Sequence, residues 1–100
     1  MPDETHQIVL VEQPGETSIR ISAEIQKNGD LQLSGQDIGK APLEIFGDSD
    51  HEYWLRVPAA RKDVLLLALL ESLYKGDACV ISKLREMLVA KKIPCEFSSQ

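Results

Sequence analysis

Four side chains of the kinds that bind metal ions or transfer protons crowd together between residues 48 and 52. They are Asp48, Asp50, His51 and Glu52. Hard cations such as calcium take several oxygen ligands from one loop, so a metal site is one interpretation. The EF-hand loop needs a central glycine and a terminal glutamate, and this spacing provides neither. A solvated acidic loop that leads into a strand is the simpler interpretation.

A cysteine–histidine pair is the second arrangement of residues that could carry out catalysis. The chain has two residues of each type: Cys79, Cys95, His6 and His51. A nucleophilic thiol needs an activating base and a third group that orients the base. No recognisable signature surrounds either cysteine, and a small buried core residue is the commoner role. We therefore assign no catalytic residue, and the sequence implies no cofactor.

The segment Gly35-Gln36-Asp37-Ile38-Gly39 is small and polar, as functional loops often are. It matches neither the dinucleotide-binding glycine pattern nor the phosphate-binding loop. Its glycines permit a turn or a bulge without any ligand, which favours a structural role. Gln36 and Asp37 remain candidates for contact with a partner.

Trp54 is the candidate binding residue with the clearest physical basis. Residues 53–57 are expected to form a strand whose odd-numbered side chains face the core, so Trp54 and Arg56 point to the other side. An exposed tryptophan beside an arginine is typical of protein interfaces. The alternatives are that residues 35–50 cover Trp54, or that the strand has the opposite register.

Three antiparallel strands are predicted in the first third of the chain, over residues 8–11, 17–27 and 31–34. Residues 17–27 alternate between apolar and polar side chains, which predicts a strand with one wet face. Asn28 and Gly29 predict a hairpin with a type I′ turn, which needs positive φ at both residues. Residues 35–52 are expected to form a connection with one helical turn.

Helical periodicity follows Pro58. The leucines at 65, 66, 67, 69, 70 and 73, with Tyr74, cover an arc of about 200°. A helix that packs on one neighbour needs an arc of only about 100°, so we expect cover on two sides, from a sheet and from a second helix or another subunit. Gly76 is expected to end this helix, and Asp77 to cap a second one over residues 78–91.

Strands followed by helices predict the α+β class. We expect an antiparallel sheet of four to five strands with the two helices of the C-terminal half packed on one face. Residues 95–98 are the candidate fifth strand. The length fits a single domain, 1–100, in which the polar, acidic residues 1–6 are expected to be disordered.

The net charge of −5 is unevenly distributed. Residues 1–52 hold eleven acids and three bases, or −8, while residues 53–100 hold five acids and eight bases, or +3. This balance disfavours nucleic acid as a partner, although four bases late in the chain could form a patch: Lys83, Arg85, Lys91 and Lys92.

The longest apolar run, residues 64–70, is too short for a membrane span. Two cysteines make no disulfide framework, so a cytoplasmic protein is expected.

Five short motifs occur in a fixed order within residues 30–98. They are Gly35-Gln36-Asp37-Ile38-Gly39, Asp50-His51-Glu52-Tyr53-Trp54, Val57-Pro58-Ala59, Lys62-Asp63 and Ile93-Pro94-Cys95-Glu96-Phe97. With the leucine-rich helix, this order resembles a family of small uncharacterised bacterial proteins with no function attached. The chain departs from that pattern at Lys92, where a glycine is expected, and at Cys95, where an aromatic residue or histidine is expected. The resemblance implies a bacterial origin and a single domain.

These observations favour a non-enzymatic protein-interaction module that acts as an accessory or immunity-type partner, or as a homodimer. The acidic N-terminal half suits a basic protein partner, because charge complementarity speeds association. The candidate contact residues are Trp54, Arg56, Gln36 and Asp37. The alternative is a small metal-dependent binder or enzyme centred on Asp48, Asp50, His51 and Glu52.

Overall fold

The structure, a computed structural model, describes residues 6–100. Two compact units are present, one up to Leu65 and one over Leu66–Gln100. We call them the sheet unit and the helical unit and describe each by itself. The predicted disorder of residues 1–6 falls almost entirely outside the described residues. The one described residue among them, His6, has a carbonyl that accepts the Ile25 N–H at 2.8 Å.

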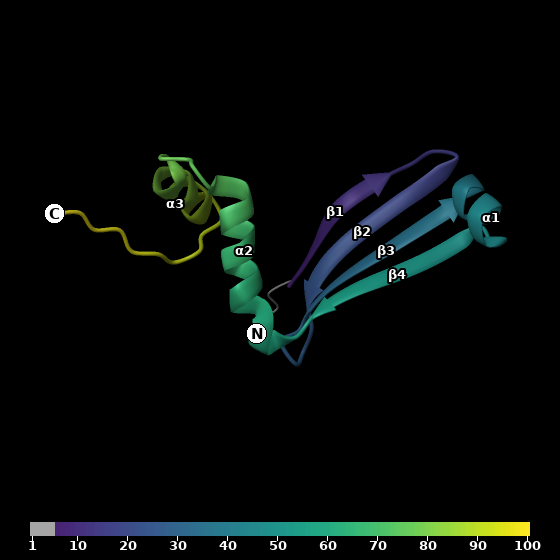
Figure 1. The fold of residues 1–100 in the computed structure, drawn as a ribbon, viewed down its shortest axis with the longest axis horizontal. Helices are drawn as coiled ribbons and strands as arrows, with labels where there is room; N and C mark the ends of the chain where they lie inside the picture. The colour runs from purple at the N-terminus through teal and green to yellow at the C-terminus, as the bar shows by residue number, and fades with distance from the viewer. Residues whose placement is uncertain (1–5) are drawn as a thin grey trace. The chain divides into compact units, whose positions relative to one another are not determined.

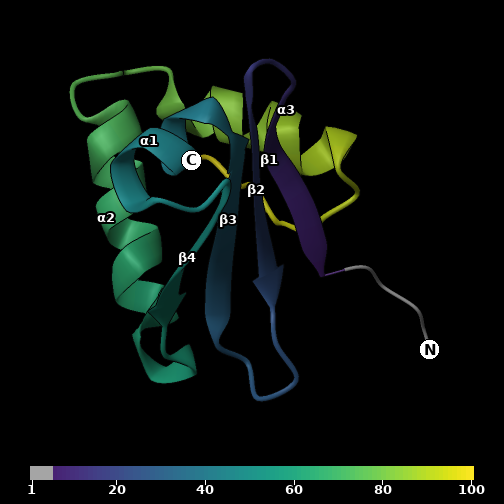
Figure 2. The ribbon, with the colours of Figure 1, turned by 90° about the vertical axis from the view of Figure 1, so that its right-hand side faces the viewer.

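The sheet unit is built on a four-stranded antiparallel meander, which confirms the α+β class and the expected antiparallel sheet. The strands lie side by side in chain order (Figures 1 and 2). Their bounds are β1 Gln7–Gln13, β2 Thr17–Ile25, β3 Leu31–Gly39 and β4 Asp50–Val57. β1 and β4 are therefore the two edges of the sheet.

The β2–β3 hairpin forms where it was predicted, but its turn is not type I′. Only Gly29 has a positive φ, at 91°, and Asn28 does not. The Gly29 N–H donates to the Gln26 carbonyl and the Gln26 N–H donates to the Asp30 carbonyl, both at 2.8 Å. This is a three-residue loop in which a left-handed glycine follows a type I turn.

The prediction of a connection over residues 35–52 is wrong at both ends. Gly35–Gly39 extends β3, and residues 50–52 begin β4, so only a short helix α1, Lys40–Phe46, and a brief turn separate the strands. β3 pairs with β2 on one side and with β4 on the other. Pairing on both sides outweighs the poor strand preference of glycine and aspartate.

The helical part of the chain begins with a short 3₁₀ turn η1, Ala59–Arg61, which leads into α2, Lys62–Tyr74. α3 spans Val80–Ala90. Before it, the Asp77 carboxylate accepts the Cys79 N–H at 2.8 Å and contacts Lys83 Nζ at 2.6 Å. Asp77 thus caps the turn that enters α3.

The predicted fifth strand over residues 95–98 does not form, and no other strand occurs in the part of the chain that the structure describes beyond Val57. Instead, the Arg85 guanidinium lies 4.1 Å from the centre of the Phe97 ring. This cation–π contact ties the tail to α3 within the helical unit.

The two faces of the sheet differ in character, because directly opposite residues of antiparallel strands point to the same face. One face, the apolar face, includes Ile19, Ile21, Ala23, Leu31, Leu33, Tyr53, Leu55 and Val57. Ala23 at its centre is buried, at 9% exposure. The alternation predicted for residues 53–57 is therefore present.

The helix α2, which runs from the end of the sheet unit into the helical unit, is not covered on two sides. Leu65, Leu70 and Tyr74 are half-buried, whereas Leu66, Leu67, Leu69 and Leu73 are 48–70% exposed. The wide apolar arc predicted from the sequence exists, and the four leucines on one part of it remain exposed.

Candidate functional site

Trp54 lies on the second face of the sheet, which we call the polar face. In the strand register Trp54 stands opposite Ser34, which stands opposite Ser22. The neighbouring rows add Arg20, Gln36 and Glu52 on one side and Glu24, Gln32 and Arg56 on the other. From β2 to β4 every residue of these three rows except Trp54 is polar, while Val9 of β1 and Ile38 of β3 are apolar residues of the same face.

The polar face is hollowed around Trp54, whose side chain is 62% exposed. A cavity of about 160 Å³ lies between Trp54, Glu52 and the two serines. A second cavity of about 380 Å³ lies toward the β1–β2 turn, and Arg20 and Gln36 line both. The serine side chains are too short to cover the indole, so the cross-strand row leaves it open.

The two arginines of the polar face are already paired, while three of its carboxylates are not. Arg20 Nη1 lies 2.7 Å from Glu12 Oε1, and Arg56 Nη1 lies 3.5 Å from Asp30 Oδ2. Among the described residues, Glu24, Asp50 and Glu52 have no cationic partner. The local charge around Trp54 is therefore negative.

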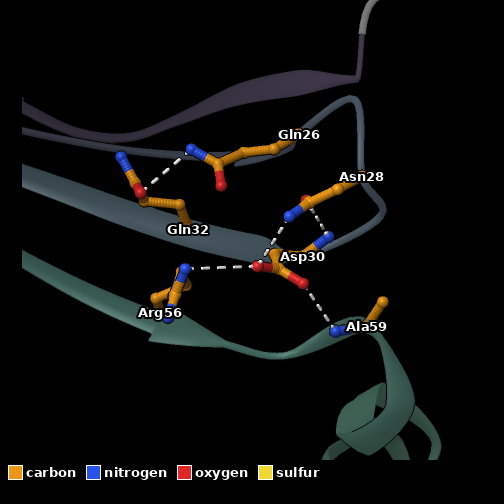
Figure 3. A network of polar contacts seen from close by, with 6 residues as sticks. All are labelled: Gln26, Asn28, Asp30, Gln32, Arg56 and Ala59. Atoms are coloured by element: carbon orange, nitrogen blue, oxygen red, sulfur yellow. Dashed lines mark hydrogen bonds and ion pairs between the residues drawn. The ribbon is translucent and has the colours of Figure 1, made fainter.

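Arg56 is held in place by a network centred on Asp30, which is 8% exposed (Figure 3). Asp30 Oδ1 accepts the Ala59 N–H at 2.8 Å, and Oδ2 accepts from Asn28 Nδ2 at 3.1 Å. The Ala59 hydrogen bond lowers the pKa of Asp30, as do Asn28, Arg56 and Lys62, while burial opposes them. Asp30 thus joins the β2–β3 hairpin to the end of β4.

Asp30 was not among the functional residues predicted from the sequence. The signal that could have found it is the spacing of Asn28 and Asp30 around the hairpin glycine. An asparagine often bonds the backbone two residues on, and here Asn28 Oδ1 accepts the Asp30 N–H at 3.0 Å.

Three of the four predicted contact residues lie together on the polar face: Trp54, Arg56 and Gln36. Asp37 lies on the apolar face instead, because it is one residue further along the strand. There its Oδ1 accepts a hydrogen bond from the Tyr53 hydroxyl at 2.8 Å. This hydrogen bond is the main cause that raises the pKa of Tyr53.

The structure does not bring together the four residues of the acidic segment. Asp50 and Glu52 lie on the polar face, whereas His51 stacks on the Phe46 ring with centroids 4.1 Å apart. Asp48 Oδ1 accepts the Asp50 N–H at 3.0 Å. Strand alternation separates these side chains, and no group of three or more His, Cys, Asp or Glu in residues 6–100 is placed to hold a metal ion.

The other candidate groups are dispersed within the helical unit. Cys79 and Cys95 are free and exposed. Of the four bases that could form a nucleic-acid patch, Lys83 pairs with Asp77 and Arg85 lies on Phe97. These two contacts use half of the proposed patch within the protein itself.

Comparisons with models of protein families, with curated proteins and with solved structures give no match. Within residues 6–100, no helix is both long enough and apolar enough to cross a membrane.

Proposed function

We propose that the chain is a non-enzymatic protein-interaction module that docks a basic segment of a partner protein on the polar face. The observation that carries this proposal is the open Trp54 side chain above a small cavity, with Glu52 beside it. The cytoplasm, where free thiols such as those of Cys79 and Cys95 stay reduced, suits this role.

The chemistry of the face favours a cation as the group that is bound. A lysine or arginine over an exposed tryptophan gains about 0.5–1 kcal/mol. Glu52 would add a charge-assisted hydrogen bond to the same cation. The acidic N-terminal half would speed the encounter, and this contribution falls as salt rises.

The single tryptophan of the chain makes the test specific, because all tryptophan emission comes from Trp54. The probe is a synthetic octapeptide of alternating arginine and serine, and its counterpart has glutamate in place of arginine. We expect a saturable change in Trp54 emission with the basic peptide that weakens as sodium chloride is raised. The acidic peptide is expected to give none.

Variants locate the binding on the polar face. By calorimetry, Trp54→Ala and Glu52→Gln are expected to weaken the basic peptide several-fold. Glu44→Gln removes one exposed acid from α1, outside the polar face, and serves as the matched control. Equal binding of both peptides, or equal loss in all three variants, would reject the proposal.

A further inference from the structure

We propose that the β4 edge pairs with β4 of a second copy of this chain and forms a continuous eight-stranded antiparallel sheet. The two copies are related by a twofold axis that passes beside Trp54. This interface goes beyond the peptide docking proposed above, and because it engages Glu52 and Trp54 it competes with a basic peptide for these two side chains.

The two edges of the sheet are not equally able to accept another strand. β4 pairs with β3 at eight consecutive positions without a shift, and it contains neither proline nor glycine. β1 carries a register shift between Val9 and Val11, where Leu10 is extra. Such bulges are a common protection of edge strands. β4 has no such protection.

Exposed side chains on both faces of β4 favour an added strand over a partner that docks on one face of the sheet. Trp54 on the polar face and Leu55 on the apolar face are neighbours in sequence, and they are 62% and 61% exposed. A helix or loop docked on one face would cover one of them. An additional strand beside β4 would give both of them cross-strand neighbours at once.

The sequence of β4 is complementary to itself in one antiparallel register. In this register Trp54 stands opposite Trp54 of the second copy. Glu52 then stands opposite Arg56 of the second copy, and by the twofold symmetry Arg56 stands opposite Glu52 of that copy. Tyr53 then stands opposite Leu55 on the apolar face. Opposite charges and aromatic–aliphatic pairs are both favourable across strands.

Shifting the register gives a poorer match. With Tyr53 opposite itself, Arg56 faces Asp50, whose Oδ1 already accepts a hydrogen bond from Gln36 Nε2 at 3.0 Å. Glu52 then faces Trp54 and gains no cation. The register centred on Trp54 instead pairs Glu52, which has neither a cationic partner nor a side-chain hydrogen bond among the described residues. Arg56 has five N–H donors, so it can contact Glu52 and keep its contact with Asp30.

The expected affinity is modest, because an edge pairing involves far fewer than the 20–30 residues a side of a standard interface. We therefore expect a dimer with a dissociation constant of about micromolar order. It forms and dissociates within the concentration range of sedimentation equilibrium.

A charge-exchange experiment tests the register directly. Glu52→Arg places arginine opposite arginine in a homodimer, and Arg56→Glu places glutamate opposite glutamate. We expect each variant to weaken dimerisation at least tenfold. An equimolar mixture of the two is expected to regain a dimer, because both cross-strand positions then pair opposite charges. Glu24→Arg, on the polar face but away from the edge, is expected to leave the dimer unchanged.

A cysteine experiment gives a second measurement that does not depend on Arg56, whose contact with Asp30 could affect folding. In a Cys79→Ser, Cys95→Ser background, Trp54→Cys places position 54 opposite itself, with Cα atoms about 4.5–5.5 Å apart. That distance permits a disulfide. Glu52→Cys lies about 13 Å from its own copy along the strand, so it is expected to stay uncross-linked under the same oxidation.

The results of these experiments test the proposed dimer independently of the proposed peptide docking. A wild-type chain that stays monomeric at about one hundred times the expected dissociation constant would overturn it. So would a mixture that fails to restore the dimer, or cross-linking at position 52 rather than 54. None of these results bears on whether the basic peptide changes Trp54 emission.

Discussion

We expect Gly35 to be required because the Tyr53 ring occupies the space on the apolar face that a side chain at position 35 would fill. The two residues stand directly opposite each other on β3 and β4. A Cβ atom added to Gly35 would clash with the ring of Tyr53, at its Cδ2, Cε2 and Cζ atoms. Gly35→Ala therefore has to displace the ring and with it the hydrogen bond from the Tyr53 hydroxyl to Asp37.

The size of the effect follows from three contributions. Forcing extra volume into a filled site costs about 1–3 kcal/mol, and loss of one hydrogen bond costs about 0.5–1.5 kcal/mol. Replacing glycine by alanine in a strand returns about 0.5–1 kcal/mol. We expect Gly35→Ala to lower the free energy of unfolding by about 1–3 kcal/mol, measured by urea denaturation.

A double-mutant cycle separates this contact from a general intolerance of the strand. Tyr53→Leu removes the ring, so Gly35→Ala in that background is expected to be neutral or slightly stabilising. Tyr53→Phe keeps the ring and loses only the hydroxyl, so the full steric penalty is expected to remain. If Gly35→Ala cost the same in the Tyr53→Leu background as in the wild type, the contact would not be the cause.

Two further predictions concern Asp30 and Gly39. The pKa of Asp30 lies below its ordinary value of 3.8 in the folded state, so its contribution to stability is present above the unfolded pKa and is lost as pH falls through the folded one. In urea titrations from pH 6 to pH 2, the stability advantage of wild type over Asp30→Asn should shrink below about pH 4, and a constant advantage would contradict this. Gly39 has φ 130°, and an added Cβ would overlap the Glu16 carbonyl. Gly39→Ala should therefore cost at least about 2 kcal/mol, against a negligible cost for Ala60→Gly in the short 3₁₀ turn, and equal costs in the two variants would refute the steric cause.

The strands and helices with strong periodicity could be predicted from the sequence, and the glycine-rich segment could not. The alternation over residues 17–27 and the leucines after Pro58 reflect local burial, so they indicate the element directly. Residues 35–39 carry no such pattern, because their strand is stabilised by partners on β2 and β4 that are distant in the chain. The same reason explains why the start of β4 at Asp50 was missed.

The part of the candidate site that depends only on strand alternation could be predicted from the sequence. Alternation places Trp54 and Arg56 on one face, and the structure agrees. It cannot say that Gln36 shares this face while Asp37 does not, because that depends on how β3 pairs with β4. The role of Asp30 also depends on tertiary structure, since Ala59 and Arg56 contact it from 26 or more residues away.

The Asp30 network connects the internal stability of the sheet unit to both proposed interactions. Without Asp30, the Arg56 guanidinium on an edge strand would sample many rotamers and would lose that freedom on pairing with a second copy. The ion pair with Asp30 at 3.5 Å already restricts the Arg56 side chain in the free chain, so Arg56 loses less conformational entropy when a partner binds. It also neutralises Arg56 on the polar face and leaves Glu52 as the dominant charge beside Trp54. Asp30→Asn should therefore weaken dimerisation and basic-peptide binding together, although Asp30 touches neither partner.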